Sequence, residues 1–136
     1  MTMSDTKYSN EFETKFEHFT VVVEESELTV STFNGKGSVK GTRAYMQMLD
    51  EILSLFPDGK ARPSLVDLSN LQDTPLRSQL MLGRWMLKNR HRVDKVALVG
   101  AKAWERKLAQ AIMKIARFKR MEFFADQGPA REWLGV

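Results

Sequence analysis

The residues that most often do chemistry in proteins are few in this sequence and widely separated. Its two histidines, His18 and His91, lie 73 positions apart and are not spaced as metal ligands. With no cysteine, the chain has no thiolate nucleophile, thiolate metal site or disulfide, which suits a reducing, cytoplasmic location. A serine-centred elbow, a metal-binding His-Glu helix and a glycine-rich phosphate loop are all missing. The sequence therefore predicts no catalytic residues, no metal and no cofactor.

Four residues are the best candidates for the rim of a small-molecule site. Asp73 and Thr74 follow one predicted strand, and Gly100 and Trp104 follow the next. Open α/β sheets bind ligands at the carboxyl ends of their strands, where the strand order reverses. We expect any such ligand to lie near these four residues. The alternative is that they only form loops and helix caps.

The segment 75–91 is predicted to be a helix with two separate apolar faces. One arc, which we expect to face the sheet, holds Leu76, Leu80, Gly83 and Leu87. The other holds Met81, Leu82 and Trp85, beyond the basic pair Arg84 and Lys88. Neighbouring helices could cover this second face, or it could be a subunit interface or a ligand groove, because Trp, Met and Arg are enriched where proteins meet. Met81 and Trp85 are therefore candidate partner-binding residues.

Positive charge is concentrated in residues 77–120, which hold 13 lysines and arginines against Asp94 and Glu105, a net charge of +11. Such a segment can attract nucleic acid, an anionic membrane or an acidic partner. On a helix over 101–118, however, the basic residues face away from an apolar arc that holds Trp104, and no aromatic residues lie between them to stack on bases. This pattern favours a solvated basic face, and nucleic acid is not the expected partner.

The spacing of apolar and turn-forming residues predicts alternating strands and helices. Strands are predicted at 19–24, 28–33, 64–68, 95–99 and 121–124, and helices at 38–56, 75–91, 101–118 and from Asp126 to Leu134. Residues 1–14 are polar and are expected to form a flexible lead-in, followed by a single domain over 15–136. No stretch is apolar enough to span a membrane.

This order, β-β-α-β-α-β-α-β-α, predicts an α/β fold with a mostly parallel, helix-covered sheet and an antiparallel hairpin at its start. The run from Lys95 to Gly100, followed by Trp104 and closed by Glu132-Trp133-Leu134, resembles the SpoIIAA-like group of STAS-type domains. The resemblance covers nearly everything after His18. It implies this fold, and it brings no catalytic residue set with it.

A second resemblance lies at Asp67-Leu68-Ser69, followed by Asp73-Thr74. It is similar to the strand and loop of anti-sigma factor antagonists, in which a serine at a helix start is phosphorylated to switch partner binding. That likeness implies a phosphorylated Thr74. The loop here is about two residues shorter, and Pro75-Leu76 replaces the Ser-Gly part of the family's turn. Helix capping alone also explains a threonine directly before a proline at a helix start.

Taken together, these features predict a non-catalytic, cytoplasmic binding or interaction domain that acts through its second helix and the loop before it. The expected partner is another protein or a second copy of the chain, as in a homodimer. The main alternative is a small carrier of a lipid-like or anionic metabolite, with its apolar part near Met81, Trp85 and Trp104. The other alternative is binding of an anionic membrane or nucleic acid through the basic helices.

Overall fold

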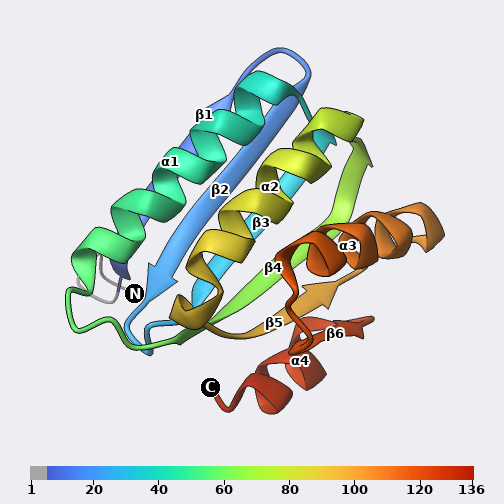
Figure 1. Ribbon diagram of the computed structural model, residues 1–136. Helices are drawn as coiled ribbons and strands as arrows, with labels where there is room; N and C mark the ends of the chain where they lie inside the picture. Colours follow the sequence, from blue (N-terminus) through green and yellow to red (C-terminus); the bar gives the residue numbers. More distant parts are fainter. Residues whose placement is uncertain (1–5) are drawn as a thin grey trace.

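The computed structural model describes residues 6–136, which form one six-stranded sheet and four α-helices (Figure 1). The strands are β1 (Thr6–Glu13), β2 (Glu17–Glu24), β3 (Thr29–Lys36), β4 (Arg62–Asp73), β5 (Val93–Val99) and β6 (Met121–Phe124). The helices are α1 (Val39–Leu55), α2 (Leu76–Asn89), α3 (Ala103–Ala116) and α4 (Gln127–Leu134), with a short 3₁₀ turn, η2 (Arg90–Arg92), after α2. The predicted fold class is confirmed.

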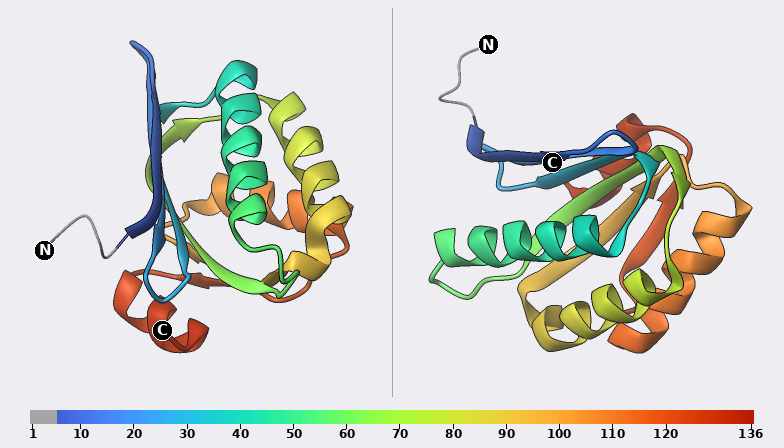
Figure 2. Two further views of the ribbon diagram at one scale, coloured as in Figure 1. Left: turned by 90° about the vertical axis from the view of Figure 1, so that its left-hand side faces the viewer. Right: turned by 90° about the horizontal axis from the view of Figure 1, so that it is seen from above.

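The strands lie in the sheet in the order in which they occur in the chain. The pairs β1–β2 and β2–β3 are antiparallel, whereas β3–β4, β4–β5 and β5–β6 are parallel. Each parallel pair is joined through one helix, and such connections are almost always right-handed. With the strands in sequential order, this handedness places α1, α2 and α3 on the same face of the sheet, as Figure 2 shows.

Two apolar clusters lie under these three helices. Phe19, Val21 and Val23 alternate along β2 and pack against Tyr45, Met48, Ile52 and Phe56 of α1 and its end. Leu68, Val96 and Leu98 of the parallel strands pack against Ala109 and Ala116 of α3. Phe33 of β3 packs against both clusters. The first cluster thus belongs to the antiparallel strands and α1, and the second to the parallel strands and α3.

Helix α4 covers the opposite face of the parallel strands. Leu65, Ala97 and Val99 pack there against Ala130 and Leu134. Strand β5 is therefore buried on both faces, as its continuous apolar run predicts.

The expected flexible lead-in is wrong for Thr6–Glu13, because these residues form the edge strand β1 beside β2. Residues 1–5 of that prediction lie outside the described residues. Phe12 stacks on Phe19 with ring centroids 5.3 Å apart, and the Tyr8 hydroxyl donates a hydrogen bond to Glu51 of α1 at 2.6 Å. Two aromatic residues among polar neighbours thus add side-chain contacts to the backbone pairing of this strand with β2.

The predicted orientation of α2 is also wrong. Leu76 is 72% exposed and Leu80 is 45% exposed, whereas Leu82 and Trp85 of the other arc face inward. Gly83, which belongs to the same arc as the leucines, lies directly against Ile115 of α3, where a β-carbon would approach the Ile115 side chain to 2.7 Å. The leucine arc is thus in contact with α3 at Gly83 and exposed at Leu76 and Leu80.

We predict that Gly83→Ala lowers the free energy of unfolding by about 1 kcal/mol, because overpacking against Ile115 outweighs the better helix propensity of alanine. Gly128 is the matched control, since it also lies in a helix but has open space where a β-carbon would lie, with no atom within 4 Å. Gly128→Ala should leave stability unchanged or raise it by up to about 1 kcal/mol. Urea unfolding of both variants is the measurement, and equal effects would show that the α2–α3 contact is not tight.

Candidate functional site

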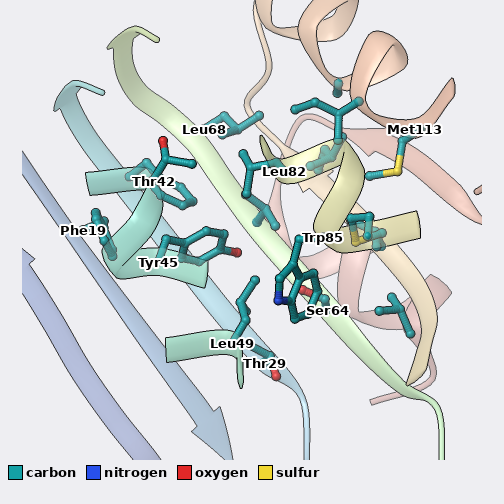
Figure 3. A pocket seen from close by; sticks show the side chains of 18 of the residues that line it. Phe19, Thr29, Thr42, Tyr45, Leu49, Ser64, Leu68, Leu82, Trp85 and Met113 are labelled. Carbon is teal, nitrogen blue, oxygen red and sulfur yellow. The ribbon is translucent and has the colours of Figure 1, made fainter. Parts of the chain in front are cut away.

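A cavity of about 200 Å³ lies between the sheet and helices α1, α2 and α3 (Figure 3). Most of its wall is apolar, and the side chains that line it include Phe19, Tyr45, Leu49, Leu68, Leu82, Trp85 and Met113. Protein interiors rarely contain voids much larger than a water molecule, and an apolar cavity of about 150 Å³ is enough to hold benzene. The size and lining therefore suit a small apolar molecule.

The cavity exists because α2 is held by its neighbouring helices and not by the sheet. Its two buried residues are Ser78 and Gly83. Thr42 of α1 donates a hydrogen bond to the Ser78 hydroxyl at 2.7 Å, while Gly83 contacts α3. Val66 lies at the centre of the sheet on β4, yet it is only half-buried and lines the cavity. The space between β4 and α2 is thus left partly unfilled.

Trp85 forms a second bridge between α2 and α1. Its indole Nε1 donates a hydrogen bond to Asp50 Oδ1 at 2.8 Å, and its ring lines the cavity, as Figure 3 shows. The sequence left open whether neighbouring helices cover Trp85 or whether it belongs to a subunit interface or a ligand groove, and the structure places its side chain beside the cavity. It therefore contributes to the wall of the cavity.

Arginines line the end of the cavity near the carboxyl end of α1. Arg92 Nη2 donates hydrogen bonds to the carbonyl oxygens of Leu53 at 3.2 Å and Phe56 at 2.8 Å. Arg62 forms ion pairs with Glu27 at 3.0 Å and Asp58 at 2.9 Å. Hydrogen bonds from Arg62 hold the pKa of the Asp58 carboxyl well below its usual value. The charge of Arg62 is thus already neutralised by protein groups.

Carboxylates line the opposite end, where α1 and α3 begin. Glu17 is buried on β2 and accepts a hydrogen bond from the Ser38 hydroxyl at 2.7 Å. Glu105 has no exposed surface, and its Oε1 accepts a hydrogen bond from the backbone N–H of Lys102 at 2.9 Å. Glu105 Oε2 is buried without a hydrogen-bond partner. Acidic side chains thus lie at one end of the cavity and arginines at the other, and Glu105 is paired with Lys102 at 3.3 Å.

Of the predicted site residues, Thr74 and Trp85 line this cavity. Thr74 and Trp104 also line a smaller hollow between the starts of α2 and α3, together with Gln79, Lys107 and Leu108. Asp73 is exposed at the end of β4, where its carboxylate accepts a hydrogen bond from the N–H of Thr74, and it lines neither space. Met81 and Gly100 line neither space. The expected four-residue rim is thus only partly assembled.

The strand order explains why that rim is incomplete. The sheet has no point at which the order reverses, so no crevice opens between neighbouring strands at their carboxyl ends. Gly100 is instead in close contact with Ser69 of β4, and its φ of +72° requires glycine. The cavity lies beneath the helices and not at the tips of the strands.

The prediction that Thr74 caps the second helix is wrong. Pro75 occupies the N-cap position of α2, and no side chain caps that helix by a hydrogen bond. The Thr74 hydroxyl lies beside Gly37, where a β-carbon would approach it to 3.2 Å. In contrast, Ser38 caps α1 as predicted, because its hydroxyl accepts a hydrogen bond from the N–H of Gly41 at 2.9 Å.

Glu105 is the residue of the site that sequence reasoning missed. The predicted apolar arc of α3 was centred near Trp104, but the buried residues of the helix are Glu105, Ala109 and Ala116, about 100° further round. A glutamate at the third helical position is a capping-box signal. The signal was hidden because Lys102 stands at the N-cap position, where serine or threonine usually precedes such a glutamate.

Many basic side chains of the segment 77–120 have structural roles. Arg92, Lys95, Lys102, Arg106 and Arg120 all donate hydrogen bonds to backbone carbonyl oxygens. Several of the basic residues behind the +11 net charge thus stabilise the backbone through hydrogen bonds. Within residues 6–136, no group of three His, Asp or Glu side chains is placed to hold a metal ion, and no helix is long and apolar enough to cross a membrane.

Comparison with solved structures shows what the fold is similar to. The chain is similar to an uncharacterised protein with a SpoIIAA-like fold from Shewanella loihica, with 18% identity, a TM-score of 0.58 and 98% of both chains covered. It is also similar to the anti-sigma factor antagonist SpoIIAA in its unphosphorylated form, with 8% identity, a TM-score of 0.60 and coverage of 95% of this chain and 98% of that chain. Both likenesses show that the chain has a SpoIIAA-like fold.

The family follows from the sequence itself. The SpoIIAA-like family matches residues 28–135, which is most of the chain. The protein belongs to the SpoIIAA-like family. No curated protein matches the sequence.

We predict that the bond between Trp85 and Asp50 stabilises the fold by about 1 kcal/mol, the usual net value of a protein hydrogen bond. Trp85→Phe should therefore lower the free energy of unfolding, and Asp50→Ala should do so as well. In the Asp50→Ala background, Trp85→Phe should cost about 1 kcal/mol less than in the wild type. Urea unfolding of the four proteins gives this coupling, and strictly additive effects would show that the bond contributes nothing.

Proposed function

We propose that this protein is a cytosolic, non-catalytic domain that binds a small apolar ligand in the cavity between α2 and the sheet. The observation that carries the proposal is the cavity itself, with about 200 Å³ of space and a mostly apolar wall. Ligand sites are typically apolar cavities with a few well-placed polar groups. The charged residues at the two ends of this cavity fit that description.

The packing around the cavity favours a ligand-binding site over a simple packing defect in the core. Filling the space would require only larger side chains at positions such as Ser64, Val66 and Ala109, which all line it. The sequence instead places small residues there and ties α2 to its neighbours by hydrogen bonds and a glycine contact. An empty apolar cavity costs stability roughly in proportion to its volume. A ligand would offset that cost.

Leu82→Trp tests the proposal, because the indole would occupy part of the cavity. We expect the affinity for octan-1-ol, a probe with a chain of suitable size, to fall at least tenfold, while stability stays level or rises by about 0.5–2 kcal/mol. Leu80→Trp is the matched control, since Leu80 is on the same helix but 45% exposed and outside the cavity. Amide NMR titration gives both the affinity and the location of binding.

The proposal would be wrong if octan-1-ol left the amides around the cavity unshifted in the wild type, or if both tryptophan variants bound it equally well. Native mass spectrometry of the purified wild-type protein adds an independent observation. A retained small molecule that Leu82→Trp no longer carries would support the proposal directly.

A second candidate function is protein interaction through the outer face of α2, with a second copy of this chain as one partner. Leu76 and Leu80 are the observation that favours it, because they are exposed on one side of that helix. Thr74 lies two residues before Leu76, and the first turn of α2 has no acidic residue. A phosphate on Thr74 would meet the partial positive charge of the helix start and could change such an interaction.

Thr74→Asp mimics this modification, and we predict that it shifts the monomer–dimer balance and raises the melting temperature slightly, because an acidic group near a helix start is worth about 0.3–1 kcal/mol. Thr74→Val keeps the shape without the charge and should do neither. Analytical ultracentrifugation and thermal unfolding are the measurements. If Thr74→Asp matches the wild type in both, phosphorylation at this position does not act as a switch.

A further inference from the structure

Two neighbouring hydroxyl groups on the sheet side of the cavity form no hydrogen bond within the fold. They belong to Thr29 of β3 and Ser64 of β4, which both line the cavity and are labelled in Figure 3. Thr29 is paired with Ser64 in the parallel register of these strands, so the two side chains lie next to each other. In contrast, the hydroxyl of Tyr45, which also lines the cavity, is hydrogen-bonded to Ser31 at 2.9 Å. Neither Thr29 nor Ser64 has such a partner within residues 6–136.

Both side chains lie on the helix-covered face of the sheet, which is the face that borders the cavity. Residues paired on neighbouring strands share a face. Thr29 is paired with Val23, which packs beneath α1. Ser64 is paired with Val96, which packs in the cluster beneath α3. The space above the two hydroxyl groups is therefore the cavity itself.

A small molecule in the cavity can reach both hydroxyl oxygens. In the described part of the chain, the side-chain atoms that are sealed from solvent and lack a hydrogen-bond partner are Arg92 Nε and Glu105 Oε2. The oxygens of Thr29 and Ser64 also lack a partner but are not sealed in this way, so each keeps surface that a water-sized molecule can touch. Thr29 is buried and Ser64 is half-buried. Hydroxyl groups in such positions nearly always have a hydrogen-bond partner.

The charges at this end of the cavity favour a neutral partner. Arg62, two residues before Ser64, is already paired with Glu27 and Asp58, so a ligand carboxylate beside it would meet two other carboxylates. Lys60 also lines the cavity, but it is exposed, and an exposed ammonium gains little from an ion pair. A cationic group would in turn be repelled by the arginine. A charge without a partner in an apolar cavity costs far more than a hydrogen-bonded neutral group.

We propose that Thr29 and Ser64 recognise the ligand by hydrogen bonding to one uncharged polar group, a hydroxyl or a carbonyl, on a small apolar molecule. A side-chain hydroxyl both donates and accepts, so a neighbouring pair suits either group. This inference rests on the proposed binding function and adds the chemical class of the ligand to it. It replaces the anionic metabolite expected from the sequence with an alcohol or a ketone. A water molecule held by the two hydroxyls is the competing explanation.

The first part of the test compares three probes with the same eight-carbon chain, namely octan-1-ol, octanoate and octan-1-amine in its ammonium form, by amide NMR titration of the wild type. We expect octan-1-ol to bind at least tenfold more tightly than either charged probe, because neither charge finds a free partner in the cavity. The protein carries a net charge of +4, which by itself would favour octanoate. A preference for the alcohol over octanoate therefore cannot come from the overall charge.

The second part removes the hydroxyls one at a time. Thr29→Val and Ser64→Ala should each lower the affinity for octan-1-ol about 3-fold to 10-fold, the range for one lost neutral hydrogen bond. Both variants should bind benzene, which has no hydrogen-bonding group, as tightly as the wild type or more tightly, and this binding also shows that they are folded. Thr32→Val is the matched control, because Thr32 is on the same strand but on its other face and outside the cavity. It should leave both affinities unchanged.

The outcomes separate the two levels of the proposal. If neither octan-1-ol nor benzene shifts the amides around the cavity of the wild type, the binding function fails and recognition by the hydroxyls fails with it. If octan-1-ol binds there but Thr29→Val and Ser64→Ala bind it as tightly as the wild type, the binding function stands, the inference is wrong, and water is the partner of the two hydroxyls. Octanoate binding as tight as that of octan-1-ol would likewise overturn the choice of a neutral ligand.

Discussion

The lateral attachment of α2 is the constraint on which the interior of this domain depends. Helices over a sheet usually gain their stability by packing an apolar face onto the strands. Here α2 is fixed from its two sides, through Ser78 to α1 and through Gly83 to α3, and its inward side chains Leu82 and Trp85 only partly fill the space above β4. The result is a cavity between the helices and the sheet. The site is therefore a property of helix spacing more than of any single residue.

The topology also gives the cavity its electrical polarity. Because α1, α2 and α3 follow parallel strands in sequential order, their starts gather at one edge of the sheet and their ends at the other. Helix starts carry partial positive charge and favour carboxylates, and helix ends favour cations. Glu17 and Glu105 lie at the first edge, and Arg92 binds carbonyl oxygens at the end of α1. The backbone dipoles that stabilise these side chains would therefore also influence how a ligand with one polar end is oriented along the cavity.

The sequence was sufficient for the fold and insufficient for the site. Periodicity identified all four helices and every strand after residue 14, because each has a long apolar pattern or a clear start and stop signal. Strand β1 was missed because its polar residues are typical of an exposed edge. Sequence patterns show that α2 has two apolar faces, but they do not show which one packs inward. That depends on tertiary contacts such as the one between Gly83 and Ile115. Glu105 was missed for a related reason. A charged residue can be recognised as buried only when it is known which face of α3 packs inward.

The division of the apolar residues beneath α1, α2 and α3 into two clusters has a consequence for cooperativity. The strands β1 to β3 with α1 form one cluster, the parallel strands with α3 form the other, and Phe33 packs against both. Regions with separate cores can open independently, with different amide hydrogen-exchange protection. The cavity lies where the two regions meet and is lined by residues of each. An occupant would contact both halves at once, so it would link their local unfolding into a single event and make the occupied domain exchange as one unit.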